Sequence, residues 1–128
     1  MAKLDETCRK VVEETEWIAI SSSGPDGPHL VATWGEYVRA LGIGDDLLII
    51  PAGRMQKTEA NVKRDNHVTL LCGTRRVTGS RGLPGQGCDI SGTADFQTSG
   101  PHFDAVKAKF PWARAALVVH VTEAKTQL

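Results

Sequence analysis

The feature that most constrains the fold is a series of six short segments with the composition of β-strands, separated by residues that form turns or begin helices. The segments cover residues 17–22, 29–34, 47–50, 67–72, 88–98 and 113–122, and the second is expected to continue through 37–41. Strands this short, with helices tucked between them, predict a closed or partly closed antiparallel barrel rather than a sheet of βαβ units.

Three places in the chain carry further local signals. The turn-rich residues 23–28 form so short a link that they predict a hairpin between 17–23 and 28–34. Gly92 interrupts an alternating segment, which is typical of a β-bulge. Residues 73–87 contain five glycines, three arginines and a proline, so we expect a long mobile loop there.

The sequence also predicts three helices. Apolar residues recur at helical spacing in 4–16, which indicates an amphipathic helix. A second segment of helical composition covers about 57–65. A third covers 101–110, where Pro101 suits the first turn and Pro111 follows the end.

Composition and charge argue against several classes of protein. A chain of 128 residues predicts one domain, residues 1–128, with a core that needs neither disulfides nor metal. Fifteen basic and fifteen acidic side chains cancel, whereas a nucleic-acid-binding protein normally carries a basic excess. No apolar run approaches the length of a membrane span, and the first residues lack a signal-peptide core. We therefore expect neither a nucleic-acid partner nor a membrane.

The cysteines and histidines show no pattern of a metal or disulfide site. Cys8, Cys72 and Cys88 are odd in number and widely spaced, which predicts reduced thiols in the cytoplasm. The four histidines are scattered, and none has a second ligand type at a zinc-like spacing. No metal site is predicted.

A candidate anion site follows the third strand segment. Pro51 brings no backbone N–H to a strand ladder, and Gly53 lets the chain turn where a side chain would clash. Lys57 and Thr58 arrive where a helix begins, and a helix start offers unpaired N–H groups and the positive end of a dipole. With the guanidinium of Arg54 nearby, four kinds of donor converge, which favours phosphate binding.

A purely structural interpretation of the same stretch is also open. In it, a loop leads into a surface helix, Thr58 caps the N-terminus of that helix, and Glu59 pairs with Lys63 one turn later. On these residues alone the structural interpretation is favoured, because short Lys-Thr pairs are common in proteins.

Three segments, in this order and at these separations, resemble one known family. They are DGPHLVATW (26–34), PAGRMQKTEANV (51–62) and WARAAL (112–117). The family is that of the small FMN-binding split-barrel proteins, within the wider pyridoxamine 5′-phosphate oxidase-like group. The resemblance implies a mainly β fold, a six-stranded antiparallel Greek-key split barrel with an N-terminal helix and two connecting helices. It also implies a homodimer with one FMN per subunit near the dimer interface.

The resemblance assigns cofactor-binding roles to residues around the candidate anion site. It places Lys57 and Thr58 at the FMN phosphate, in agreement with the donors described above. It implies that Pro51, Ala52 and Gly53 run their backbone past the flavin ring.

Further residues are assigned around the ring by the same resemblance. Thr33 and Trp34 are expected beside the cofactor, with Tyr37 close by. Trp112 is expected to pack near the isoalloxazine, and Leu128 to cover the flavin of the partner subunit. The aromatic residues among them also suit an ordinary core.

Arg54 departs from the family pattern, which has a second glycine at this position. Its guanidinium either adds a contact to the FMN phosphate or points into solvent.

The sequence offers no catalytic residue, because no His, Asp or Glu is placed as a general base and nothing resembles an activated nucleophile. If FMN binds, the cofactor supplies the redox chemistry. The leading hypothesis is electron transfer with a redox partner protein. One alternative is an FMN-dependent oxidoreductase, either an oxidase of a pyridoxamine-like substrate or a flavin reductase that uses NADH or NADPH. Another is a dimeric scaffold that binds heme, another flavin or no cofactor.

Overall fold

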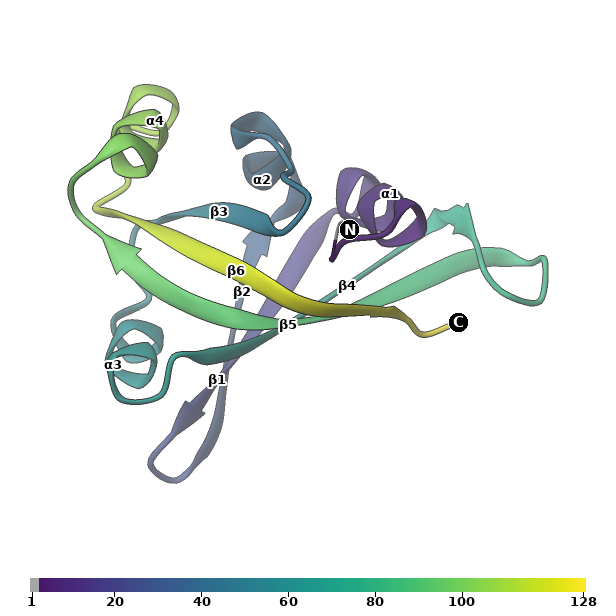
Figure 1. Ribbon diagram of the computed structural model, residues 1–128, viewed down its shortest axis with the longest axis horizontal. Coiled ribbons are helices and arrows are strands. Elements are labelled where there is room, and N and C mark those ends of the chain that lie inside the picture. The colour runs from purple at the N-terminus through teal and green to yellow at the C-terminus, as the bar shows by residue number, and fades with distance from the viewer. Residues whose placement is uncertain (1–2) are drawn as a thin grey trace.

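The computed structural model describes residues 3–128, and its six antiparallel strands form one sheet that curls into a half-barrel (Figure 1). The strands are β1 (Trp17–Gly24), β2 (Gly27–Trp34), β3 (Leu47–Ala52), β4 (His67–Thr78), β5 (Pro84–Gln97) and β6 (Ala115–Thr126). Their order across the sheet is β2-β1-β4-β5-β6-β3. The mainly β, six-stranded antiparallel split barrel predicted from the sequence is therefore confirmed.

Four helices accompany the sheet in residues 3–128: α1 (Glu6–Glu14), α2 (Gly35–Leu41), α3 (Gln56–Arg64) and α4 (Pro101–Lys109). In the view of Figure 1, α1, α2 and α4 lie above β5 and β6, whereas α3 lies below them. Predictions for three of these helices are confirmed with small shifts of their ends. The fourth, α2, was not predicted.

The main core lies between the inner face of the sheet and the helices. Side chains of β1 and β4 alternate between buried and exposed, which places Ile18, Ile20 and Leu70 inside. The apolar face of α1 adds Val11 and Val12 to the same cluster. A smaller cluster lies under α4, where Val106 packs with apolar residues of β3 and β6.

The prediction that the second strand continues through 37–41 is wrong, because α2 begins at Gly35. The Gly35 N–H donates a hydrogen bond to the Glu16 carbonyl, at 2.9 Å. A Cβ atom at position 35 would lie 2.1 Å from the carbonyl oxygen of Thr15. Only glycine allows this close approach, which turns the chain out of the strand and into a helix that buries Val38.

The expected long loop at 73–87 is also wrong. β4 runs to Thr78 and β5 begins at Pro84, so the two strands form an extended hairpin (Figure 1). Gly73 pairs with Gly87 in the ladder. Hydrogen bonds between backbone groups hold this arm together. Glycines take part in such bonds, but they give no side-chain pattern from which a strand could be predicted.

The other local predictions are confirmed. β1 and β2 pair from Trp17↔Trp34 to Gly24↔Gly27, which makes the expected hairpin. The register between β5 and β6 shifts at Ser91/Gly92, where the β-bulge was predicted.

Candidate cofactor-binding site

The junction between β3 and α3 forms the centre of the site. Pro51 and Ala52 are buried at the end of β3, where they pair with Ala116 and Ala115 of β6. Met55 has a φ of 65°, and it is the one non-glycine residue with positive φ among the residues described. Such a conformation is unfavourable for a residue with a Cβ and is kept only where surrounding contacts hold it. The turn that leads into α3 is therefore held in place by its surroundings.

The first turn of α3 exposes backbone donors. Met55 is the N-cap residue and its side chain makes no capping hydrogen bond, so the N–H groups of Gln56, Lys57 and Thr58 lack an intrahelical partner. The Lys57 side chain is exposed, and within residues 3–128 no acidic side chain forms an ion pair with it. Backbone donors and an ammonium group thus share one end of the helix.

The expectation that Thr58 caps this helix is wrong, because Thr58 lies inside the first turn and is fully buried. Its hydroxyl oxygen, Oγ1, has no hydrogen-bond partner. Leaving a buried hydroxyl unpaired costs about 1–3 kcal/mol. The hydroxyl, the ammonium of Lys57 and the free N–H groups are donors that together fit a phosphate group. Because Oγ1 is buried, a ligand reaches it only after neighbouring side chains shift.

The alternative pairing of Glu59 with Lys63 is present as well, with Nζ of Lys63 at 3.8 Å from Oε2 of Glu59. The ion pair of the structural interpretation is therefore present, although its Thr58 cap is not.

Three aromatic rings lie beside the junction. Tyr37 of α2 lies with its ring centroid 4.9 Å from that of Phe110 and 5.6 Å from that of Trp112. The Trp112 side chain is 52% exposed, so one part of this cluster faces solvent. Phe110 was missed by the sequence analysis because a lone phenylalanine after a helix gives no signal of a site.

Gly53 brings the aromatic cluster onto the β3–α3 loop. A Cβ atom at this position would lie 3.2 Å from Cζ3 of Trp112. The indole therefore lies directly against the backbone that was predicted to pass the flavin ring.

Thr33 and Trp34 lie at the end of β2, immediately before α2. Thr33 is buried, whereas Trp34 is exposed and is paired in the β-ladder with the exposed Trp17 of β1. Since Trp34 precedes the helix that carries Tyr37, this end of β2 leads into the aromatic cluster.

Leu128 lies far from the start of α3, on the side of the sheet that carries Trp17 (Figure 1). In Figure 1, α3 and the end of β6 lie on opposite sides of the molecule. Gln86 holds Leu128 there, because its side-chain carbonyl accepts from the Leu128 N–H at 2.7 Å and its amide donates to the Leu128 carbonyl at 2.6 Å. Leu128 lines a cavity of about 590 Å³ together with Trp17.

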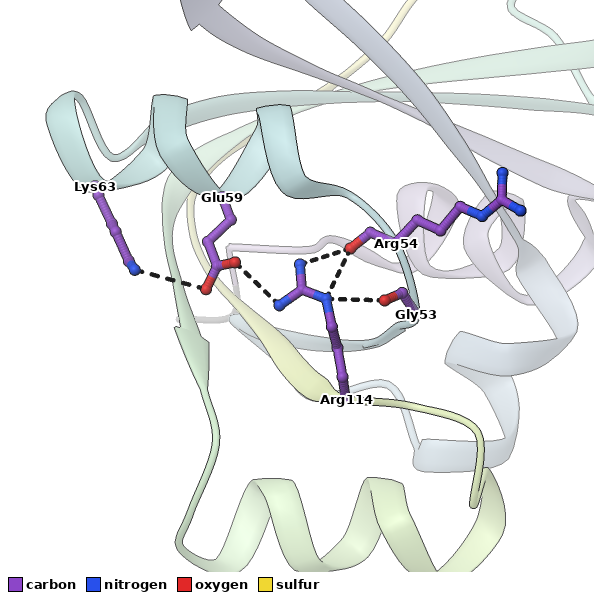
Figure 2. A network of polar contacts seen from close by, with 5 residues as sticks. All are labelled: Gly53, Arg54, Glu59, Lys63 and Arg114. Carbon is purple, nitrogen blue, oxygen red and sulfur yellow. Dashed lines mark hydrogen bonds and ion pairs between the residues drawn. The ribbon is translucent and has the colours of Figure 1, made fainter.

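A network around Arg114 joins the loop to α3, and the sequence analysis missed it (Figure 2). The guanidinium donates hydrogen bonds to the carbonyl oxygens of Gly53 and Arg54 and forms an ion pair with Glu59. The side chain of Arg54 extends away from this network (Figure 2).

The cysteines lie away from this junction, in the main core. Burial raises the pKa of the Cys72 thiol to about 12 and also raises the pKa of Cys8 and of Cys88. These thiols are therefore protonated near neutral pH and are poor nucleophiles. Among the described residues, no group of three or more His, Cys, Asp or Glu side chains is placed to hold a metal ion. None of the helices described in residues 3–128 is long and apolar enough to cross a membrane.

Comparison with known proteins identifies the family. A family model described as pyridoxamine 5′-phosphate oxidase matches residues 4–127. The chain belongs to this family.

Several known proteins are similar to this chain. The FMN-binding protein of Nitratidesulfovibrio vulgaris is 46% identical over 119 residues, which cover 93% of this chain and 94% of that protein. Among solved structures, a HupZ variant from Group A Streptococcus matches with a TM-score of 0.74 at 15% identity, covering 97% of this chain and 99% of the other. An FMN-binding protein from Syntrophomonas wolfei matches with a TM-score of 0.69 at 16% identity, covering 98% and 86%. At these low identities the two structures show the shared fold alone.

Proposed function

We propose that this chain is an FMN-binding flavoprotein that transfers electrons. The observation that carries the proposal is the buried hydroxyl of Thr58, which has no partner and belongs to the uncapped first turn of α3. A phosphate offers oxygen acceptors to all of these donors at once. The 46% identical relative, named as an FMN-binding protein, supports FMN as the molecule that carries this phosphate.

The proposed phosphate contacts come from the start of α3. Lys57 supplies a mobile positive charge, Thr58 supplies its hydroxyl, and the first-turn N–H groups supply fixed donors. Arg54 is exposed, and its side chain extends away from the Arg114 network (Figure 2). The proposed contact of Arg54 with the phosphate would be made by this outward-pointing side chain.

The proposed ring contacts come from the loop and the aromatic cluster. Pro51, Ala52 and Gly53 offer backbone groups, and Trp112 packs directly on Gly53. Tyr37 lies within the same cluster. Thr33 and Trp34, at the end of β2, complete this proposed set.

Electron transfer is the activity that suits this set of residues. When bound, FMN supplies redox chemistry that side chains lack. The proposed residues around the ring are mostly apolar or aromatic, so they orient the ring and exclude water without moving protons themselves. We therefore assign no catalytic residue and propose a protein as the redox partner.

We also propose that the protein acts as a homodimer. Trp17, Leu30, Trp34 and Leu71 are large exposed apolar side chains. The strand registers place them on one face of β1, β2 and β4, the face that points away from the core. Such a face is typical of a contact with another protein. A second subunit bound to this face would also bring Leu128 of one subunit to the flavin site of its partner.

The cytoplasm is the proposed location. All three cysteines are free thiols in the structure, which fits a reducing compartment.

The family description favours a second candidate function, an FMN-dependent oxidoreductase. Turnover assays separate the two functions. An electron carrier shows no steady consumption of NADH, NADPH or pyridoxamine 5′-phosphate in the presence of oxygen, whereas a flavin reductase or an oxidase consumes one of them continuously.

Cofactor binding itself is tested on the freshly purified protein. The proposal predicts a yellow protein that releases close to one FMN per chain on acid precipitation. A colourless protein that also fails to take up added FMN would remove the proposal.

A further inference from the structure

We propose that Arg114 is a positioning residue of the phosphate site, although it does not itself contact the phosphate. It orients the loop that enters α3 and neutralises the carboxylate of Glu59 beside that site (Figure 2). This inference rests on the proposed function, since it concerns how tightly the FMN phosphate is held.

The guanidinium of Arg114 holds two consecutive carbonyl groups. Nε lies 2.8 Å from the Gly53 oxygen, and Nη2 lies 2.6 Å from the Arg54 oxygen. The described peptide bonds are all trans, so each N–H points opposite to the carbonyl of the residue before it. The N–H groups of Arg54 and Met55 therefore point away from Arg114. One side chain thus fixes which side of the loop presents acceptors and which presents donors.

The same bonds support the strained turn at Met55. Its positive φ is unfavourable and persists only under constraint from its surroundings. The two carbonyls held by Arg114 belong to the two residues that immediately precede Met55. Releasing them frees the turn to relax, and the first turn of α3 then loses its orientation.

The second role of Arg114 is electrostatic. Glu59 follows Thr58 directly and stands in the first turn of α3. Its side chain is only 21% exposed, so water screens its charge poorly. An uncompensated carboxylate there repels a phosphate dianion at the same helix end. Nη1 of Arg114 lies 3.0 Å from Oε1 of Glu59 and supplies the compensating charge.

Lysine could not replace arginine in this arrangement. Four hydrogen bonds to two carbonyls and one carboxylate require a planar group with several fixed donors, which an ammonium lacks. The guanidinium also lies 5.9 Å from the centre of the Phe96 ring, a contact that helps to fix its position. Lys63, the other cation near Glu59, is 75% exposed and contributes little.

The test compares FMN with riboflavin, which has the same ring and no phosphate. Apoprotein is titrated with each ligand, and the quenching of flavin fluorescence gives the two dissociation constants. The ratio of the riboflavin constant to the FMN constant measures the contribution of the phosphate site alone. The variants are Arg114→Met, Arg114→Lys, Glu59→Gln and the double variant Arg114→Met/Glu59→Gln, with Lys63→Met as the matched control.

We expect Arg114→Met to lower this ratio about tenfold, because FMN binding weakens while riboflavin binding changes less than about twofold. Adding Glu59→Gln to Arg114→Met restores about half of the loss on a logarithmic scale. The second substitution removes the uncompensated charge, but it does not restore the hydrogen bonds that hold the loop. Arg114→Lys gives an intermediate ratio, and Lys63→Met leaves it unchanged. If Arg114→Met does not fold, the neutral Arg114→Gln with and without Glu59→Gln carries the same comparison.

Two results would overturn the inference while leaving FMN binding intact. One is an equal loss of FMN and riboflavin affinity in the Arg114 variants, which indicates a general structural role. The other is no recovery on adding Glu59→Gln. If the unmodified protein binds neither ligand, the proposed function itself fails, and the inference falls with it.

Discussion

At the scale of single residues, the start of α3 is where local chemistry and family likeness agree. Lys57 and the buried Thr58 were expected at a phosphate from their residue types and from the strand-to-helix position. The structure adds an unpartnered Thr58 hydroxyl and an uncapped first turn to that expectation. These are properties of backbone conformation and packing, which a residue's identity does not reveal.

Lys57→Ala is expected to weaken FMN binding by about 10–100-fold, because it removes one charge-assisted hydrogen bond of about 1.5–3 kcal/mol. Lys63→Ala removes the same charge at the other end of α3 and is the control, with little change expected. Fluorescence titration of apoprotein measures both. Equal affinities for Lys57→Ala and the unmodified protein would mean that the phosphate site lies elsewhere.

The buried thiol of Cys72 predicts a pH dependence of stability. Its pKa is raised from 9.0 to about 12 in the folded protein by desolvation. Above pH 9 the unfolded state therefore loses its thiol proton while the folded state keeps it, and stability falls as the pH rises toward 12. The expected contribution of Cys72 to the slope is on the order of 1 kcal/mol per pH unit, and Cys8 and Cys88, whose pKa values are also raised, add to it.

Urea denaturation between pH 8 and pH 11 measures this slope. Cys72→Ala lacks the titrating thiol, so the variant should lose less stability over the same range. Identical slopes for the two proteins would contradict the role of this thiol.

At the scale of elements, the sequence predicted those features that depend on side-chain pattern and missed those that depend on backbone contacts. The β1–β2 hairpin and the bulge at Gly92 have local signals, and both are present. The helix α2 depends on the approach of Gly35 to Thr15, which lies far away in sequence, and so it was mistaken for strand. The β4–β5 arm is rich in glycine and was mistaken for a loop.

The candidate site also combines features that have a local sequence signal with features that depend on distant contacts. Residues 51–58 are contiguous and form a readable motif, whereas the contact of Arg114 with Gly53 spans 61 residues and leaves no local signal. Its role became visible only through the fold.

Gly35→Ala should destabilise the protein by about 2–3 kcal/mol, because the added Cβ would lie 2.1 Å from the backbone oxygen of Thr15 and the backbone would have to shift. Gly73→Ala is the matched control, since its Cβ would lie at an ordinary 3.5 Å from the nearest atom. Urea denaturation compares them. A Gly35→Ala variant as stable as Gly73→Ala would show that the β2–α2 junction is more adaptable than this geometry implies.

At the scale of the whole molecule, the role proposed for Leu128 requires a second subunit. The proposed site collects residues from β2, α2, β3, α3 and the segment before β6, while the C-terminal end of the chain lies far from α3 (Figure 1). The exposed apolar face of β1, β2 and β4 is the surface proposed to bring a second subunit within reach.

Leu71→Glu places a charge on the β4 part of that face. The variant is expected to convert a dimer to a monomer in sedimentation velocity experiments, with weaker FMN binding as a consequence. Ala108→Glu adds the same charge to the exposed side of α4 and should leave the dimer unchanged. If both variants dimerise with equal affinity, the subunit contact lies on another surface.

A crystal structure of the protein with FMN would show whether the start of α3 holds the FMN phosphate. We expect phosphate oxygens within hydrogen-bonding distance of the Thr58 hydroxyl, with Lys57 beside them and the flavin ring near Trp112. A phosphate bound elsewhere, for example at the arginines of the β4–β5 arm, with the Thr58 hydroxyl still unpaired, would contradict this expectation.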